Sequence, residues 1–332
     1  MIVRGRAPFR ISFGGGGTDV PPYCWEEGGA VLNSTIDRYA YSTVETGREG
    51  YELISYDAGM RVKYNDLVYD GKLDLLKAVM KVINAGPGLR TGTYSEVPAG
   101  SGLGGSSTLA VSLAAALSGA LSVNLNKYNL AMAAYRAERE ELKQAGGYQD
   151  QFAAAYGGIN YMEFSNGKIN VVPLMLPDEE VAELQYRSLL FYLGSNRLSS
   201  QIHDSMNRKY KEEEGKQREL RRRLKGIAHR MKDELSRGNI DEFGLLLNEN
   251  WVAKKGMSEL ISNGEIDRIY AKAINAGALG GKVLGAGGGG HMLIFCRADR
   301  RQEVMKEMAD AGLINVPFAF EDGGAIYWKL QV

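Results

Sequence analysis

Residues that build disulfide frameworks and structural zinc sites are scarce in this sequence of 332 residues. It contains two cysteines, Cys24 and Cys296, which are far apart and in no metal-ligand spacing. The three histidines, His203, His229 and His291, are scattered, and no H-E-x-x-H pattern occurs. We therefore expect neither a disulfide framework nor a structural zinc site. Two reduced cysteines are typical of a cytoplasmic protein.

An excess of charge of either sign is also lacking. Lysine and arginine number 40, and aspartate and glutamate also number 40, so the charge balance indicates no nucleic-acid or membrane partner. The longest run of small apolar residues, Leu109 to Val123, is shorter than a membrane span. The opening segment MIVRGRAPFRISF has too short an apolar stretch for a signal peptide. We expect a cytoplasmic protein.

The sequence is rich enough in apolar residues for two ordinary domains. Hydrophobic residues make up 44% of the chain and charged residues 24%, as in globular proteins. The order of patterns predicts an α+β fold with an antiparallel sheet, and a boundary near 174–183 gives domains of residues 1–178 and 179–332. The predicted strands are 39–45, 51–56, 91–97, 159–164, 169–172, 188–193, 281–284, 292–296, 318–321 and 325–330, and the predicted helices are 73–84, 106–122, 127–144, 199–237, 265–276 and 301–311.

The most informative segment is PAGSGLGGSST, residues 98–108, which follows a strand-like pattern and precedes a helical one. Its four glycines let backbone N–H groups approach a polyanion, and the helix N-terminus adds unpaired donors and a positive dipole. A tight turn capped by serine is the simpler alternative. The segment lacks the G-K-S/T of a Walker A motif and the position of a dinucleotide fingerprint. The residues assigned to a phosphate site are Pro98, Gly100, Ser101, Gly102, Leu103, Gly104, Gly105, Ser106 and Ser107.

Two carboxylates stand out after this loop. Glu138 shares a helix face with Ala131, Tyr135 and Leu142, so it interrupts an apolar stripe. A carboxylate turned toward a core needs a cation or donors, which magnesium or an arginine could supply. Asp150 follows two glycines where a new helix begins. It could be an ordinary N-cap or a general base that faces a substrate hydroxyl.

Two further glycine clusters lie near the ends of the chain. Residues 14–17 are four successive glycines between Arg10 and Asp19, and they let the backbone pass close to a ligand or another strand. Asp19 could accept hydrogen bonds from sugar hydroxyls, although a flexible hairpin tip is the alternative. The segment KVLGAGGGGH, residues 282–291, lies between two predicted strands. This segment could simply be a glycine-rich hairpin. Alternatively, its glycines could let the backbone come close to a ligand or to the phosphate loop.

Together these segments resemble the GHMP kinases, which are named for galactokinase, homoserine kinase, mevalonate kinase and phosphomevalonate kinase. Residues 7–19 resemble the substrate motif of that family, 98–107 its phosphate loop and 283–290 its C-terminal glycine motif. The resemblance implies a two-domain fold, with an N-terminal ribosomal-protein-S5-like α/β domain and a C-terminal ferredoxin-like α/β sandwich. It also implies ATP and Mg2+ as cofactors.

Within the family, GGGGTDVPPY and GGYQDQFAAAYGGIN most resemble kinases of D-glycero-D-manno-heptose 7-phosphate. This implies ATP-dependent phosphorylation of the anomeric (C1) hydroxyl to the 1,7-bisphosphate, in nucleotide-heptose biosynthesis. By resemblance, Glu138 and Ser106 hold Mg2+, Asp150 accepts or orients the anomeric proton, and Arg10 holds Asp150 or the phosphoryl group. The residues implied to bind substrate are Gly15, Gly16, Thr18, Asp19, Arg197, Gly287 and Gly288.

The phosphate loop departs from the family pattern at one position. Gly105 occupies the place of the first serine in the usual pair, so Ser106 aligns with the metal-binding serine and Ser107 is an extra hydroxyl. The choice between the two serines stays open.

A 7-phosphate group requires its own cationic subsite, for which Arg197, Arg38 and Lys254 are the candidates. Arg197 precedes two serines at a predicted helix start, which suits a phosphate. The charge density of the helix over 199–237 is otherwise interpreted as a solvated face.

Three other functions remain alternatives. A kinase of an unphosphorylated sugar, such as fucose or galactose, would use the same machinery. A catalytically silent sensor of sugar and ATP would keep the fold but does not require both Glu138 and Asp150. An NAD-dependent dehydrogenase fits least, because the expected fingerprint is absent. The sequence leaves a homodimer open as the assembly state.

Overall fold

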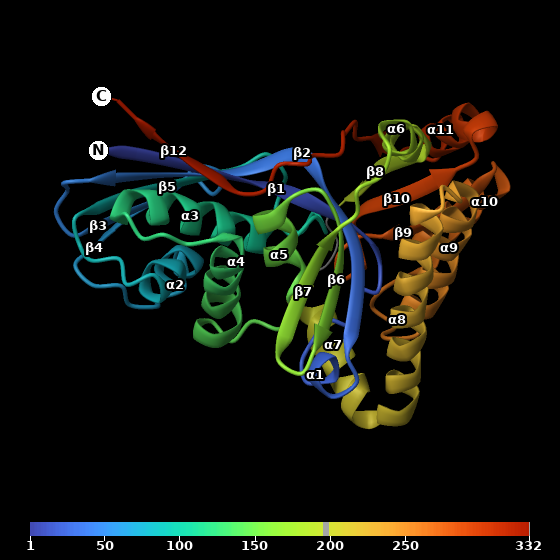
Figure 1. The fold of residues 1–332 in the computed structure, drawn as a ribbon, viewed down its shortest axis with the longest axis horizontal. Helices are drawn as coiled ribbons and strands as arrows, with labels where there is room; N and C mark the ends of the chain where they lie inside the picture. The colour runs from blue at the N-terminus through green and yellow to red at the C-terminus, as the bar shows by residue number, and fades with distance from the viewer. Residues whose placement is uncertain (195–198, 332) are drawn as a thin grey trace.

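Two sheets with their covering helices lie side by side along the long axis of the protein (Figure 1). The structure is a computed structural model that describes residues 1–194 and 199–331. The larger sheet has eight strands in the order β12-β1-β2-β5-β3-β4, and the β6–β7 hairpin is attached to β2. Its strands are β1 (Ile2–Gly14), β2 (Gly29–Thr46), β3 (Tyr51–Ser55), β4 (Met60–Tyr64), β5 (Leu89–Ser95), β6 (Ile159–Ser165), β7 (Lys168–Pro173) and β12 (Ile326–Leu330).

The long strands β1 and β2 run through the centre of the molecule. They pair antiparallel from Ile2 opposite Glu45 to Gly14 opposite Leu32. From Ala7 onward every residue of β1 is buried, and helices from both halves of the chain contact the strand. Arg10 therefore lies on a buried strand between the two halves, and it is only 2% exposed.

Small residues let helix α3 (Gly105–Leu121) lie close to β1 and β2. Ala114, Ala115 and Ala116 are fully buried, and a Cβ atom on Gly5 would come within 2.3 Å of the Ser112 carbonyl oxygen. Because a close-packed interior leaves no room for extra atoms, larger side chains at these positions would push α3 away from the sheet. The neighbouring helices are α1 (Tyr23–Glu26), α2 (Asp74–Val82), α4 (Lys127–Tyr135) and α5 (Gln149–Tyr156).

The smaller sheet has four antiparallel strands in the order β11-β8-β10-β9. In chain order this is fourth, first, third and second, the arrangement of a ferredoxin-like β-α-β-β-α-β unit. The ferredoxin-like α/β sandwich expected in the second half of the chain is therefore present. The elements are α6 (Asp178–Arg187), β8 (Ser188–Gly194), α7 (Ser199–Glu212), α8 (Glu214–Ser236), α9 (Ile240–Lys255), α10 (Gly264–Asn275), β9 (Ala278–Val283), β10 (Gly290–Cys296), α11 (Arg301–Asp310) and β11 (Ile314–Asn315).

Two predicted helices differ from those in the structure. The helix over 127–144 is α4 followed by a π-helical turn, Arg136–Glu141, which contains Glu138. The charged helix over 199–237 is two helices, α7 and α8, because Glu213 between them adopts a non-helical conformation. A π-helical turn widens the backbone locally and is frequent at functional sites.

The predicted strand 318–321 is wrong. Only one isolated bridge forms there, between Phe320 and Ile36, and no ladder extends from it among the described residues. Strand β12 leaves the second half of the chain and pairs with β1 in the larger sheet. The boundary between residues 178 and 179 stays a prediction. It would separate β12 from the sheet in which that strand lies.

Within residues 1–194 and 199–331, no helix has the length and apolar character needed to cross a membrane.

Candidate active site

The glycine-rich loop connects β5 to the start of α3. Gly100, Gly102 and Gly104 have φ angles of 76°, 79° and 84°, the left-handed region that favours glycine. Gly104 immediately precedes α3, so the loop turns sharply and presents backbone N–H groups beside the helix N-terminus. This is the geometry expected of a phosphate cradle.

The third glycine cluster packs against this loop. A Cβ atom on Gly102 would lie 2.7 Å from the Leu284 carbonyl oxygen, and one on Gly290 would lie 2.6 Å from the Ser101 carbonyl oxygen. The buried His291 ring contacts the same Ser101 oxygen through Nδ1 at 2.7 Å. Of the two alternatives, the structure therefore shows close approach of this cluster to the loop, which it supports from behind.

Glu138 receives three hydrogen bonds and is fully buried. The Ser106 hydroxyl donates to its Oε1 at 2.6 Å, the Ser107 hydroxyl donates to Oε2 at 2.6 Å, and Gln151 Nε2 donates to Oε2 at 2.5 Å. Arg139 is more remote, with Nη1 3.9 Å from Oε1. The three donors stabilise the buried carboxylate, and they join it to the first turn of α3 through the two serines and to α5 through Gln151.

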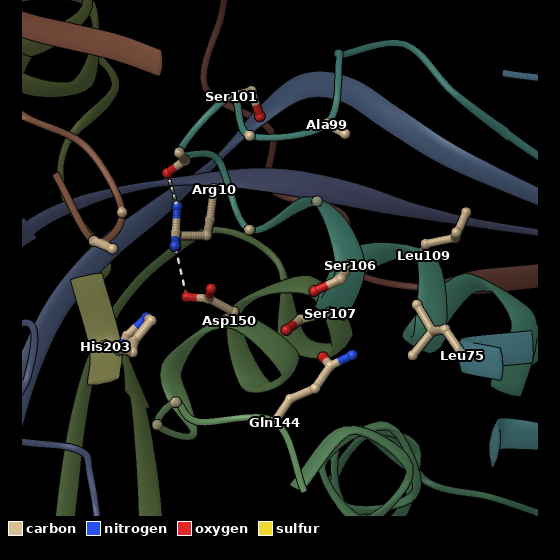
Figure 2. A pocket seen from close by; sticks show the side chains of 18 of the residues that line it. Arg10, Leu75, Ala99, Ser101, Ser106, Ser107, Leu109, Gln144, Asp150 and His203 are labelled. Carbon is tan, nitrogen blue, oxygen red and sulfur yellow. Dashed lines mark hydrogen bonds and ion pairs between the residues drawn. The ribbon is translucent and has the colours of Figure 1, made fainter. Parts of the chain in front are cut away.

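Asp150 is the N-terminal acidic residue of α5, and it is bound by an arginine from β1. Arg10 Nε donates to Asp150 Oδ1 at 2.8 Å, and Arg10 Nη1 donates to the Gly102 carbonyl oxygen at 2.7 Å. Figure 2 shows both bonds and the Asp150 carboxylate near the start of α3. A single guanidinium thus fixes a carboxylate and the phosphate-type loop relative to each other.

Asp19 and Lys254 add two buried charges beside this pair. Asp19 is 1% exposed and accepts hydrogen bonds from the backbone N–H groups of Gly17 and Gln149, each at 3.0 Å. Lys254 Nζ donates to the Gly16 carbonyl oxygen at 3.0 Å. Burial lowers the pKa of Lys254 to about 8, although the nearby Asp19 acts in the opposite direction.

His203 lies on α7 and faces the Asp150 side of the cavity (Figure 2). Burial, together with the positive charges of Lys254 and Arg139, lowers the pKa of His203 to about 4. The imidazole is therefore neutral at pH 7 and could accept or donate a single hydrogen bond.

These side chains line one cavity of about 1130 Å³. Its charged end is formed by Arg10, Asp19, Asp150, His203 and Lys254. At its leucine end, Leu75 and Leu109 lie on the other side of Ser106 and Ser107 from Asp150, and Gln144 lies next to Ser107 (Figure 2). The glycine-rich loop lies between the two ends, so the cavity can hold two molecules that meet at the loop.

Comparison with known proteins identifies the family of this site. The sequence pattern of the GHMP kinases N terminal domain matches residues 73–158, and that of the GHMP kinases C terminal domain matches residues 231–313. The chain is 36% identical over 338 residues to D-glycero-alpha-D-manno-heptose 7-phosphate kinase of Campylobacter jejuni, a match that covers 99% of both chains.

The chain belongs to the GHMP kinase family.

Other relatives agree with this assignment. The crystal structure of a D-glycero-D-manno-heptose 1-phosphate kinase from Bacteroides thetaiotaomicron superposes with a TM-score of 0.82 at 34% identity, over 99% of this chain and 100% of that one. The bifunctional fucokinase/GDP-fucose pyrophosphorylase of Arabidopsis thaliana is 28% identical over 91% of this chain and 31% of its own length. The prediction of an ATP-dependent phosphotransferase is confirmed, since the protein is a GHMP kinase.

Most residues predicted for this kinase site lie in or against the cavity. Every residue assigned to the phosphate site lines it, except Leu103, which is buried beneath the loop. Arg10, Asp19 and Asp150 also line it, and Glu138 lies directly behind the two serines. Family membership does not test these individual roles, so they stay predictions.

Several predicted substrate residues lie behind the cavity wall. The Thr18 hydroxyl is fully buried. It donates to the Ala30 carbonyl oxygen at 2.9 Å and accepts from the Ala30 N–H at 3.0 Å, so it holds the segment after the glycines at 14–17 against β2. Gly15 donates its N–H to Asn250 Oδ1 at 3.1 Å. Gly15, Gly16, Gly287 and Gly288 are not among the lining residues, and Arg197 lies outside the described residues.

The three candidates for a substrate phosphate have separate positions. Lys254 lines the charged end, whereas Arg38 donates to the backbone carbonyls of Asp37 and Pro317 away from the cavity.

Sequence reasoning missed His203, because a lone histidine on a charged helix carries no local signal. It also missed Gln151 as the third donor to Glu138, although both glutamines beside Asp150 belong to the GGYQDQF segment.

Proposed function

We propose that this GHMP kinase transfers the γ-phosphoryl group of ATP to the anomeric hydroxyl of D-glycero-D-manno-heptose 7-phosphate. The product would be the 1,7-bisphosphate used in nucleotide-heptose biosynthesis. The Campylobacter relative, which this chain matches over its full length, supports the choice of sugar. The observation that carries the proposal is the Arg10 bridge, which joins Asp150 to the Gly102 carbonyl of the phosphate loop.

The bridge suits phosphoryl transfer because this reaction depends on positioning and charge neutralisation more than on a strong base. The acceptor hydroxyl would lie against Asp150, which takes its proton as the phosphoryl group arrives. Within the described residues, Arg10 Nη2 forms no hydrogen bond, so it is the donor left for an oxygen of the transferring group. If the hydroxyl proton leaves late in the reaction, a weakly basic carboxylate such as Asp150 is sufficient to accept it.

The acceptor sugar would occupy the charged end. Asp19 retains acceptor capacity beyond its two backbone bonds, and Lys254 and His203 add donors nearby. The nucleotide would then occupy the leucine end, with its base against Leu75 and Leu109 and its phosphates on the loop. This orientation brings the γ-phosphoryl group to the Asp150 side of α3.

The residues present fit a magnesium ion. Mg²⁺ in kinases is held by one or two carboxylates together with substrate phosphates, and Glu138 with the Ser106 hydroxyl supplies hard oxygen ligands. Ser106 is exposed to the cavity, whereas Ser107 is 2% exposed, so we assign Ser106 to the metal and Ser107 to holding Glu138. When bound, the ion would neutralise charge on the β- and γ-phosphates.

The direct test measures ADP release with a panel of acceptors at saturating ATP. We expect turnover with D-glycero-D-manno-heptose 7-phosphate, and phosphorus NMR of the product should show a new anomeric phosphate. Turnover with free sugars only would reject the sugar phosphate as substrate. The 28% identity to a fucokinase-containing protein makes a kinase of an unphosphorylated sugar the second candidate, and fucose and galactose belong on the same panel.

A further inference from the structure

A second, smaller cavity adjoins the charged end. It has a volume of about 240 Å³ and is lined by residues 20–23 together with side chains from α7 and α8, among them Tyr210, Lys211 and Arg221. Val20 lines both cavities, and Asp19 directly precedes it. The volume is several times the share of a single water molecule, about 30 Å³. A molecule in the charged end could therefore extend past Asp19 into this space.

Arg221 is a buried cation without an anionic partner in the part of the chain that the structure describes. It is 4% exposed, and its Nη1 donates to Gln217 at both the carbonyl oxygen and Oε1, each at 3.2 Å. The rings of Tyr210 and Tyr23 lie 4.5 Å and 5.9 Å from its guanidinium carbon. Burial lowers the pKa of Arg221 to about 10, so the group is still charged at pH 7.

The neighbouring arginines on the same helix behave differently. Arg218 pairs with Glu26, Glu27 and Glu214, and Arg222 pairs with Glu27. Since Glu27 already binds both of these arginines, it does not neutralise Arg221. Leaving a charge buried and unpaired is costly, and proteins normally avoid it unless a ligand completes the site.

Two phenol groups beside Arg221 are also without partners. The hydroxyls of Tyr23 and Tyr210 are buried, and neither forms a hydrogen bond in the described structure. Burial raises the pKa of Tyr23 to about 12 and raises that of Tyr210, so both groups are protonated donors at neutral pH. One cation and two O–H donors around a cavity form an arrangement that suits a phosphate.

We propose that the cavity at Arg221, Tyr23 and Tyr210 binds the phosphate at the far end of the acceptor sugar. This inference rests on the proposed function, in which the reacting hydroxyl lies at Asp150. The sugar ring would pass Asp19 and Val20, and its terminal phosphomonoester would bind the Arg221 guanidinium and the two phenol hydroxyls. The site would then select phosphorylated over free sugars.

The test compares Arg221→Met with Arg222→Met as the matched control, since Arg222 lies one residue further along α8 and is exposed. The Michaelis constants for heptose 7-phosphate and for the free heptose are measured on the full-length enzyme at saturating ATP. Charge-assisted hydrogen bonds imply a rise of about 10- to 100-fold in KM for the phosphorylated sugar with Arg221→Met. We expect less than about a two-fold change for the free heptose, and no effect of Arg222→Met on either.

Inorganic phosphate supplies an independent measurement. With a non-hydrolysable ATP analogue saturating the loop, calorimetry should detect phosphate binding to the wild type and to Arg222→Met, and loss of binding in Arg221→Met. If Arg221→Met does not fold, Tyr210→Phe removes one donor only and should raise KM for heptose 7-phosphate by about three- to ten-fold.

The outcomes separate the two proposals. A wild type that phosphorylates heptose 7-phosphate, together with equal KM values for Arg221→Met and Arg222→Met, overturns the subsite and leaves the proposed function intact. A wild type that does not use heptose 7-phosphate rejects the proposed function, and the phosphate titration then decides the subsite by itself. Phosphate binding that survives in Arg221→Met overturns it.

Discussion

The charged end and the leucine end of the large cavity are built in different ways. At the charged end, Asp19 and Arg10 are almost fully buried and each has fixed hydrogen-bond partners from segments far apart in the sequence. At the leucine end, Leu75 and Leu109 are partly exposed, and Gln144 is exposed. The first end is rigid and polar, and the second is open and mostly apolar.

With the sugar at the charged end and the nucleotide at the leucine end, as proposed above, this difference predicts where specificity resides. A sugar presents several hydroxyl groups of defined stereochemistry, and buried polar groups discriminate strongly because a wrong ligand leaves them unpaired. A purine base presents a flat apolar surface, for which partly exposed leucines are sufficient. Substitutions at the charged end should therefore cost far more than substitutions at the leucine end.

The largest expected effect is that of Asp150→Asn, which keeps the size of the side chain but removes the proton acceptor. Loss of a positioned base should lower kcat by about 10²- to 10⁴-fold. Asp204→Asn is the control, because Asp204 also lines the cavity but is exposed on α7. Steady-state kinetics on both variants make the test, and wild-type turnover in Asp150→Asn would rule out its role as base.

A smaller effect should separate the two serines of the loop. Ser106→Ala should raise the Mg²⁺ concentration required for half-maximal activity by about 10- to 100-fold, since a ligand to the ion is lost. Ser107→Ala removes a donor to buried Glu138 and should instead lower the melting temperature. Mg²⁺ titrations of activity and thermal unfolding of both variants check this assignment. The reverse pattern would assign the metal to Ser107.

Lys254 should make KM for the acceptor depend on pH, with a change of about ten-fold. Because burial lowers its pKa to about 8, the side chain loses its charge above that pH, and KM for the acceptor should rise. Lys254→Met should have a raised KM that is independent of pH between about 7 and 9. A rise in KM that is the same in both proteins would exclude Lys254 as the cause.

The same group also affects stability. Above about pH 8 the folded protein binds fewer protons at Lys254 than the unfolded chain does. The wild type should therefore gain stability relative to Lys254→Met as the pH rises through 8. Denaturant unfolding at two pH values measures this difference.

The smallest effect is expected at the leucine end. Leu75→Ala removes part of an apolar contact, and at about 0.8 kcal/mol for each buried CH₂ group a partly exposed leucine implies a rise of about three-fold in KM for ATP. The values of kcat and of KM for the acceptor should not change. A large loss of kcat would show that this end also positions the reacting groups.

Local patterns were sufficient to predict the glycine-rich turn before α3 and the burial of Glu138. Four glycines before a helix start, and one carboxylate on an apolar stripe, are visible within short windows of sequence. The predicted strands 159–164 and 169–172 are confirmed as β6 and β7, which pair through a turn at Asn166-Gly167 where both residues take the positive φ angles typical of such a hairpin.

Contacts between distant segments could not be predicted in this way. Glu27, almost two hundred residues before Arg221, binds the neighbouring Arg218 and Arg222, whereas Arg221 has no acidic partner among the described residues. From sequence alone, the helix that carries Arg221 is an ordinary solvated face. The positions of His203 and Lys254 likewise depend on how α7 and α9 pack against the loop at 14–17.

Strand β12 has a consequence for how the protein can be divided. It covers the outer edge of β1, where five consecutive residues from Ile2 to Arg6 have partners in it. A fragment that ends near residue 178 would lack this cover and would expose unpaired backbone donors and acceptors along β1. Such edges promote association between chains. Any engineered version that separates the two halves will therefore need the final strand supplied, for example by fusing it ahead of residue 1.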